Sequence, residues 1–306
     1  MPTRPWRNAR LHGWKRLPKL ERVLVEPIVR AALLEDIGRG GDLTTEAIVT
    51  PEHAATAEFV ARAPGVVAGI DVALLAFALL DQSVETTVIV PDGDPVGAGD
   101  RVATVRGRAR PILTGERTAL NFLNRLSGIA TATRALVEAV AGTRARVADT
   151  RKTTPGLRIL EKYAVRCGGG VNHRFGLDDA VLIKDNHLAQ CPLHDAVAAV
   201  RARVGHTVKV EVEVDTLEQL AAALEEPIDA VLLDNMSPEQ LTEAVRRVGR
   251  RVLTEASGGV TLESIAAIAR SGVDLISVGR ITHSAPALDI GLDVQAGDDA
   301  SFLMER

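Results

Sequence analysis

Cysteine, aromatic residues and lysine are all scarce in this chain of 306 residues. The two cysteines, Cys167 and Cys191, show no CxxC or His/Cys ligand spacing, so neither a disulfide framework nor a zinc site is indicated. Aromatic residues make up 3%, which leaves no stacking platform for single-stranded nucleic acid. A net charge of -4 also argues against a surface that coats nucleic acid. We therefore expect no nucleic-acid partner.

Long hydrophobic runs are missing as well. No run of about 18 apolar residues would span a bilayer, so we expect no membrane partner. Residues 1–22 form a basic N-terminal extension, but this extension lacks the apolar run that a secretory signal needs. A transit peptide or a lipid-touching arm is an alternative to a mobile cytoplasmic extension. The last interpretation is favoured, and we expect a cytoplasmic protein.

Only six of the 36 basic residues are lysines. Two lie in the N-terminal extension and four fall in or beside motif-like segments: Lys15, Lys19, Lys152, Lys162, Lys184 and Lys209. A compact ammonium is a point charge that a planar guanidinium does not replace, so the lysines near strand ends are candidate site residues. A solvated helix face is the alternative, above all for Lys162.

The length and a hydrophobic content of 46% predict about two domains. The first, residues 23–127, begins with a helix over Val23–Leu34 and a loop over residues 35–49. Short β-type runs between Ala57 and Arg110, around a helix near Val72–Leu80, are typical of an α+β sandwich. A helix over Glu116–Leu126 follows, and Ser127–Gly128 is the expected junction to the second domain.

Residues 128–284 alternate short apolar strands with helix-like stretches, which indicates a parallel β/α barrel or a doubly wound sheet. The barrel is favoured by the run VKVEVEVD, whose valines occupy one face and whose charged residues occupy the other. Central strands of an open parallel sheet are apolar on both faces, so a charged face needs a polar lumen. We expect residues 285–306 to return to the N-terminal domain.

Polar residues follow the predicted strands of the barrel, where catalytic groups of such barrels lie. They are Arg151, Lys152, Lys184, Glu213, Asp234, Ser257, Gly258, Gly259 and Gly279. Because burying an unpaired charge is costly, they imply either mutual salt bridges or a charged ligand. The turns ASGGVTLESI and SVGRITHS favour a phosphate site. The run Gly168–Gly170 either delivers His173 and Arg174 to the site at the strand ends or is a linker.

A resemblance makes this more specific. The segments TRKTTPGLRILEKYAVRCGGGVNHRFGLDDAVLIKDNH, GERTALNFLNRLSGIAT, EVEVD, LLDN, ASGG and VGRITHS resemble those of the quinolinate phosphoribosyltransferase (decarboxylating) family, the nicotinate-nucleotide pyrophosphorylases of NAD biosynthesis. The likeness runs from about Val23 to Asp293. It implies an α/β protein: an incomplete (seven-stranded) parallel β/α barrel with an N-terminal α+β sandwich domain, working as a homodimer or a higher assembly of dimers.

The resemblance also implies the reaction. Quinolinate and phosphoribosyl pyrophosphate, with Mg²⁺, give nicotinate mononucleotide, pyrophosphate and CO₂. The implied catalytic residues are Lys152, Glu213 and Asp234, of which Glu213 and Asp234 also hold the metal. The implied substrate-binding residues are Arg117 from the neighbouring subunit, Thr150, Arg151, Lys152, His173, Arg174, Lys184, Glu213, Asp234, Ser257, Gly258, Gly259, Gly279, Arg280 and His283.

Three alternatives stay open. The molybdenum-transport-associated phosphoribosyltransferase paralogue shares the fold and uses another acceptor. A non-catalytic barrel that binds phosphorylated metabolites has no need of Glu213 and Asp234. An isomerase-type barrel needs a titratable base, for which His173 is the candidate. Arg280 stands where the family leads us to expect a small residue, and it either adds a phosphate contact or narrows the loop.

Overall fold

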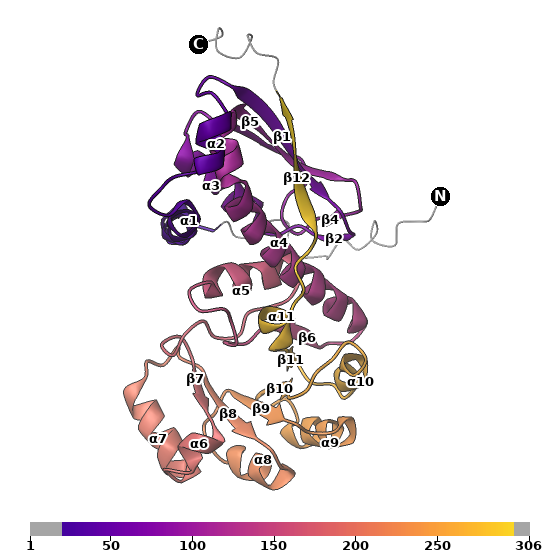
Figure 1. Ribbon diagram of the computed structural model, residues 1–306. Coiled ribbons are helices and arrows are strands. Elements are labelled where there is room, and N and C mark those ends of the chain that lie inside the picture. Colours follow the sequence, from indigo (N-terminus) through magenta and orange to yellow (C-terminus); the bar gives the residue numbers. More distant parts are fainter. Residues whose placement is uncertain (1–19, 297–306) are drawn as a thin grey trace, which may run out of the picture. The chain divides into compact units, whose positions relative to one another are not determined.

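The computed structural model describes residues 20–296, which form two compact units (Figure 1). Unit 1 takes in the described residues up to Ala132, Thr154–Gly169 and those from Ala285. Unit 2 consists of Thr133–Thr153 and Gly170–Ser284. The sequence prediction had placed Thr154–Gly169 in the barrel domain. Most of the basic extension (residues 1–19) and residues 297–306 lie outside the described part.

Unit 1 is built on an antiparallel sheet with the strand order β12-β1-β5-β3. These strands are β1 (Ala54–Ala61), β3 (Glu85–Val88), β5 (Arg101–Arg108) and β12 (Ile290–Ala296). A small second sheet pairs β2 (Gly65–Val66) with β4 (Pro95–Val96). The helices are α1 (Arg22–Ile37), α2 (Leu43–Ile48), α3 (Ile70–Leu80), α4 (Ala109–Ala139, which continues into unit 2) and α5 (Arg158–Cys167). Phe59 on β1 and Phe77 on α3 are fully buried, with ring centroids 6.1 Å apart.

Two sequence predictions for unit 1 are wrong in detail. The loop expected over residues 35–49 contains α2, whose first turn is capped by the Asp42 side chain accepting from Thr45 N at 2.9 Å. The helix expected to end at Leu126 continues to Ala139. Ser127 and Gly128 do not break it: Ser127 Oγ accepts from Ala68 N at 3.0 Å, and a Cβ on Gly128 would lie 2.0 Å from Pro286 O. These small residues allow the backbone at Ala68 and Pro286 to approach the middle of the helix closely.

The C-terminal segment adds β12 to the edge of this sheet. It runs antiparallel to β1, with Phe59 opposite Leu292, and Asp293 forms an ion pair with Arg62. Strand β12 therefore completes the sheet of unit 1 although it follows the whole of unit 2 in sequence.

Unit 2 contains a parallel sheet with the order β6-β11-β10-β9-β8-β7 (Figure 1). The strands are β6 (Arg146–Ala148), β7 (Val181–Ile183), β8 (Val210–Val214), β9 (Ala230–Asp234), β10 (Leu253–Ser257) and β11 (Leu275–Ser277). The helices between and after them are α6 (Asp185–Leu188), α7 (Leu193–Arg203), α8 (Leu217–Ala223), α9 (Pro238–Val248), α10 (Ile265–Arg270) and α11 (Arg280–His283).

The structure has six strands here where seven were expected. The seventh position is a single parallel bridge between Val171 and Ala148, beside β6. That bridge and β7 therefore lie at opposite ends of the strand order, which leaves the barrel incomplete. On β8, Val210, Val212 and Val214 are buried on one face, as the alternation predicts. Within residues 20–296, no helix combines the length and apolarity needed to cross a membrane.

Candidate active site

The parallel strands of unit 2 bring the predicted site residues to one edge of the sheet. Because all six strands run in the same direction, their carboxyl ends lie at the same edge. Twelve predicted site residues lie at or shortly after one of these ends: Thr150, Arg151, Lys152, Lys184, Glu213, Asp234, Ser257, Gly258, Gly259, Gly279, Arg280 and His283. His173 and Arg174 follow Val171, which forms the bridge beside β6. Arg117 is exposed on α4 in unit 1.

Two guanidinium groups lie near each other at this edge. Burial and the charge of Arg151 lower the pKa of Arg174, whose Nη1 donates to Ala180 O at 3.0 Å. Arg151 Nε is buried, and the residues that the structure describes give it no hydrogen-bond partner. A buried donor without an acceptor is costly. The arrangement therefore favours an anion that accepts from both arginines.

A lysine and a carboxylate meet at the neighbouring strand ends. Lys184, directly after β7, forms an ion pair with Glu213 on β8, with Nζ 2.5 Å from Oε2. The Lys184 side chain is 42% exposed, whereas that of Glu213 is 14% exposed. On the next strand, Asp234 accepts from the side-chain amide of Asn235 at 2.6 Å. The carboxylates of Glu213 and Asp234 therefore lie on adjacent strands at the carboxyl edge of the sheet, which we call the mouth.

Glycine allows two backbone segments to approach each other at the end of β10. Gly258 has φ +95°, and a Cβ there would lie 2.1 Å from Asn235 Oδ1. Asn235 N in turn donates to Ser257 O at 2.9 Å. A side chain at position 258 would therefore collide with the loop that follows β9, so this turn requires glycine.

The loop after β11 lies against Lys152. Thr282 Oγ1 donates to Lys152 O at 2.8 Å. A Cβ on Gly279 would lie 2.9 Å from Lys152 Cδ and 3.5 Å from His283 Nε2. His283 also contacts Ser284 Oγ through Nδ1 at 2.5 Å. Lys152, Gly279 and His283 therefore gather at one corner of the mouth, while Arg280 is exposed.

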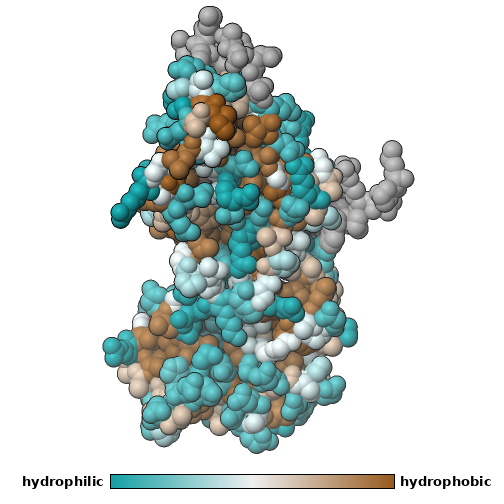
Figure 2. Space-filling model, viewed as in Figure 1, coloured by the Kyte–Doolittle hydropathy of each residue, from teal (hydrophilic) through white to brown (hydrophobic). Residues whose placement is uncertain are grey.

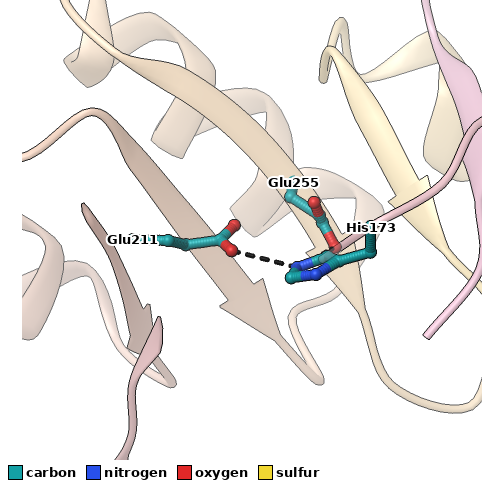
Figure 3. A group of neighbouring side chains, drawn as sticks. All are labelled: His173, Glu211 and Glu255. Carbon is teal, nitrogen blue, oxygen red and sulfur yellow. Dashed lines mark hydrogen bonds and ion pairs between the residues drawn. The ribbon is translucent and has the colours of Figure 1, made fainter. Parts of the chain in front are cut away.

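Beneath the mouth lies a cluster that the sequence prediction missed, formed by His173 with Glu211 and Glu255 (Figure 3). His173 Nε2 is 3.0 Å from Glu211 Oε2 and 3.6 Å from Glu255 Oε1. Burial, and then the charge of Glu211, raise the pKa of Glu255 to about 7. Asp149, fully buried, accepts from His173 N at 2.9 Å and from the Asn172 amide at 2.6 Å.

The sequence contained a signal for these residues. Glu211 precedes Glu213 by two positions on β8, and Glu255 precedes Ser257 by two positions on β10, so each shares a face with a predicted site residue. The prediction placed Glu211 on the polar face of its strand and gave it no role. Only the fold shows that residues from β8 and β10 converge on His173.

Comparison with known proteins identifies the family of this chain. The model of "Quinolinate phosphoribosyl transferase, N-terminal domain" matches residues 42–127, and that of "Quinolinate phosphoribosyl transferase, C-terminal domain" matches residues 129–293. The chain belongs to the quinolinate phosphoribosyltransferase family. The family and fold predicted from the sequence motifs are therefore confirmed.

Individual members of the quinolinate phosphoribosyltransferase family cover nearly the whole chain. A nicotinate-nucleotide pyrophosphorylase [carboxylating] of Mycobacterium leprae is 50% identical over 87% of this chain and 95% of its own length. A probable nicotinate-nucleotide pyrophosphorylase [carboxylating] of Bacillus subtilis is 43% identical over 92% of this chain and 97% of its own. The crystal structure of NadC from Streptococcus pyogenes, 40% identical, superposes with a TM-score of 0.88 and covers 92% of this chain and 100% of that one.

Proposed function

We propose that the carboxyl edge of the parallel sheet in unit 2 is the active site for the reaction of this family. The chain is a decarboxylating quinolinate phosphoribosyltransferase, a pentosyltransferase of NAD biosynthesis. It converts quinolinate and phosphoribosyl pyrophosphate to nicotinate mononucleotide, pyrophosphate and CO₂. The observation that best supports this site is the neighbouring pair Arg151 and Arg174, with Arg151 Nε buried and lacking an acceptor among the described residues. A planar dianion offers each guanidinium a carboxylate.

Three cations form the quinolinate subsite. Arg151 follows β6, Arg174 follows the bridge at Val171, and Lys184 follows β7. Arg151 and Arg174 each donate two hydrogen bonds to one carboxylate, and Lys184 adds a point charge. Thr150 shapes the loop, since its Oγ1 accepts from Lys152 N at 3.0 Å. His173 lies next to Arg174 at the bottom of this subsite. Charge-assisted hydrogen bonds of this kind contribute roughly 1.5–3 kcal/mol each.

The phosphoribosyl subsite lies along the later strands. Glu213 and Asp234 bind the ribose hydroxyls. The backbone of Ser257, Gly258 and Gly259, together with the loop from Gly279 to His283, binds the 5′-phosphate, and Arg280 adds a cation there. The close packing of Gly258 on Asn235 supports this assignment, because backbone N–H groups free of side chains are the usual ligands of a phosphate in such barrels.

Magnesium fits the carboxylates at the mouth. Glu213 and Asp234 supply oxygen ligands from adjacent strands, and Mg²⁺ is commonly held by one or two carboxylates together with substrate phosphates. When bound, the ion neutralises charge on the departing pyrophosphate. We expect activity to disappear on chelation and to return with added Mg²⁺. The Asp234→Asn variant should need a higher Mg²⁺ concentration for half-maximal rate; an unchanged requirement would contradict the assignment.

The side chains act by orientation and electrostatics. As pyrophosphate leaves, positive charge develops at the ribosyl carbon, and the carboxylates at the mouth stabilise that charge. Lys152 lies against the loop from Gly279 to His283 that binds the 5′-phosphate, and it compensates the negative charge of both substrates. Once the pyridine nitrogen is ribosylated it is cationic, and its charge stabilises the electron pair that the departing CO₂ leaves on the adjacent ring carbon. That carbon then takes up a proton from solvent. The enzyme positions the departing carboxylate without over-stabilising it.

Arg117 completes the site from a second copy of the chain. It is exposed on α4, and we propose a homodimer in which it reaches the quinolinate subsite of the partner. Exposed hydrophobic residues of unit 1 support an interface there: Val23, Leu24 and Leu34 on α1 and Leu43 and Ile48 on α2. Figure 2 shows hydrophobic surface in the region of these helices. We place the protein in the cytoplasm, with no nucleic-acid or membrane partner.

The deciding experiment is a turnover assay with quinolinate, phosphoribosyl pyrophosphate and Mg²⁺ that follows CO₂ and pyrophosphate together, with nicotinate as the comparison acceptor. Equal amounts of CO₂ and pyrophosphate from quinolinate alone are expected. Pyrophosphate without CO₂, or no turnover, would contradict the proposal and favour the paralogue that uses another acceptor. Screening other acceptors with the same ribosyl donor would then identify it.

A further inference from the structure

Two further carboxylates, those of Glu211 and Glu255, lie inside the incomplete barrel, two residues before predicted site residues on their strands. Glu211 and Glu213 lie on the same face of β8, and a spacing of two residues places Glu211 about 6.6 Å further along the strand from the mouth. Glu255 lies in the same way below Ser257 on β10. Both deeper carboxylates point to His173 (Figure 3). The proposed reaction assigns no role to Glu211 or Glu255.

The hydrogen bonds of His173 determine where its ring proton lies. Nδ1 accepts from Arg174 N at 2.7 Å, so Nδ1 carries no proton. The proton of the ring is therefore on Nε2, which donates it to Glu211 Oε2 at 3.0 Å. A metal ion at this cluster would need the lone pair of Nε2, which this tautomer does not offer. The cluster is thus arranged to hold an imidazole, and its acidic residues do not form a cation site.

Contacts that fix His173 also restrain Arg174, because the backbone N–H of Arg174 donates to the His173 ring. The backbone of His173 is fixed by Asp149. Burial, and then the like charge of Arg151, lower the pKa of Arg174, while the charges of Asp179 and Glu211 act in the opposite direction. The Arg174 guanidinium therefore lies near a like charge that opposes its own. Two guanidinium groups without a bound anion repel each other, so a fixed frame is needed to keep them together.

We propose that Glu211, with Glu255 also beside the ring, is a positioning residue that fixes His173 and thereby keeps Arg174 beside Arg151 in the quinolinate subsite. This inference rests on the proposed function. It predicts that Glu211 affects binding of the diacid and leaves binding of the ribosyl donor unchanged. A purely structural carboxylate would affect both substrates, or neither.

The test is the Glu211→Gln variant, which keeps the size of the side chain and removes its charge. We expect the Kd and KM for quinolinate to rise roughly 10-fold or more, as for loss of a charge-assisted hydrogen bond. The KM for phosphoribosyl pyrophosphate should stay within about two-fold of the original. A matched control is Glu226→Gln, which removes the partner of exposed His194, 3.1 Å away, and should change neither constant. Equal effects on both substrates would overturn the inference.

A double-mutant cycle tests whether Glu211 acts through His173. If it does, the variant that combines Glu211→Gln with His173→Gln should bind quinolinate no more weakly than His173→Gln alone. Additive losses would contradict the inference. Thermal unfolding identifies variants that fail to fold. If Glu211→Gln does so, Glu211→Asp keeps the charge but withdraws it from Nε2, and unchanged quinolinate affinity in that variant would overturn the inference.

The two proposals fail in different ways. Failure of the original protein to bind and turn over quinolinate would contradict the proposed function. If the original protein turns over quinolinate and Glu211→Gln binds it equally well, only the positioning role is wrong.

Discussion

Lys184 and Glu213 form an ion pair across the ends of β7 and β8, with Nζ 2.5 Å from Oε2. In the proposed reaction these residues have different partners, a quinolinate carboxylate for Lys184 and the ribose and metal for Glu213. Each side chain therefore compensates the charge of the other until the two substrates separate them. The ion pair thus links the two subsites.

Replacing Lys184 by Met should lower kcat/KM for quinolinate by roughly 10- to 100-fold, because a charge-assisted contact is lost and Glu213 is left without its partner. Steady-state kinetics with both substrates will measure this. The matched control is Lys209→Met. Lys209 pairs with Asp229 at the opposite end of these strands, 2.7 Å away, and is 72% exposed, so its loss should leave kcat/KM within about two-fold. Similar losses in both variants would argue against a role for Lys184.

Mixing inactive subunits tests the origin of Arg117. Arg117→Ala and Glu213→Ala should each be inactive alone. If Arg117 acts in the partner's site, a mixed dimer has one site with both residues intact, so random mixing should restore about a quarter of the original activity. Denaturing the two variants together, refolding them and assaying turnover measures this. No recovery in dimers shown to be mixed would place Arg117 in its own subunit's site or outside the site.

The glycines after β10 should differ in their tolerance of alanine. Gly258→Ala combines φ +95° with a Cβ 2.1 Å from Asn235 Oδ1, whereas Gly259 has φ +58° and nothing within 4 Å of its Cβ position. We expect Gly259→Ala to lower the free energy of unfolding by roughly 1–2 kcal/mol and Gly258→Ala to lower it by more. Gly258→Ala should also raise the KM for phosphoribosyl pyrophosphate. Denaturant unfolding of both variants measures the costs, and equal costs would show that the contact with Asn235 is unimportant.

Glu255 should make stability depend on pH. Burial and then Glu211 raise its pKa to about 7 in the folded protein, from an ordinary value of 4.5. The folded state therefore binds the proton of Glu255 more tightly than the unfolded state does. As the pH rises from 4.5 to about 7, the free energy of unfolding should fall by on the order of 3 kcal/mol. The Glu255→Gln variant cannot ionise, so its free energy of unfolding should lack this decline between roughly pH 4.5 and 7. Parallel pH profiles for the two proteins would contradict the assignment.

Much of the fold was predictable because its signals are local. The alternation of β8 predicted a charged lumen, and Glu211 and Glu213 do lie on the face opposite the buried valines. The residues after each strand predicted the composition of the mouth, because parallel strands end at one edge. Predictions failed where a local pattern was overridden by distant contacts. Gly128 was interpreted as a break, but the space it leaves is occupied by Pro286.

The sequence by itself determined the family, the alternation of strands and helices, and the identity of the cations and carboxylates at the mouth. Tertiary structure alone decided which of these residues meet. Glu211 and Glu255 are 44 positions apart, and their approach to His173 depends on strand order and on the bridge at Val171. Periodicity specifies the face on which a side chain lies, whereas the partner it faces depends on packing between segments distant in sequence.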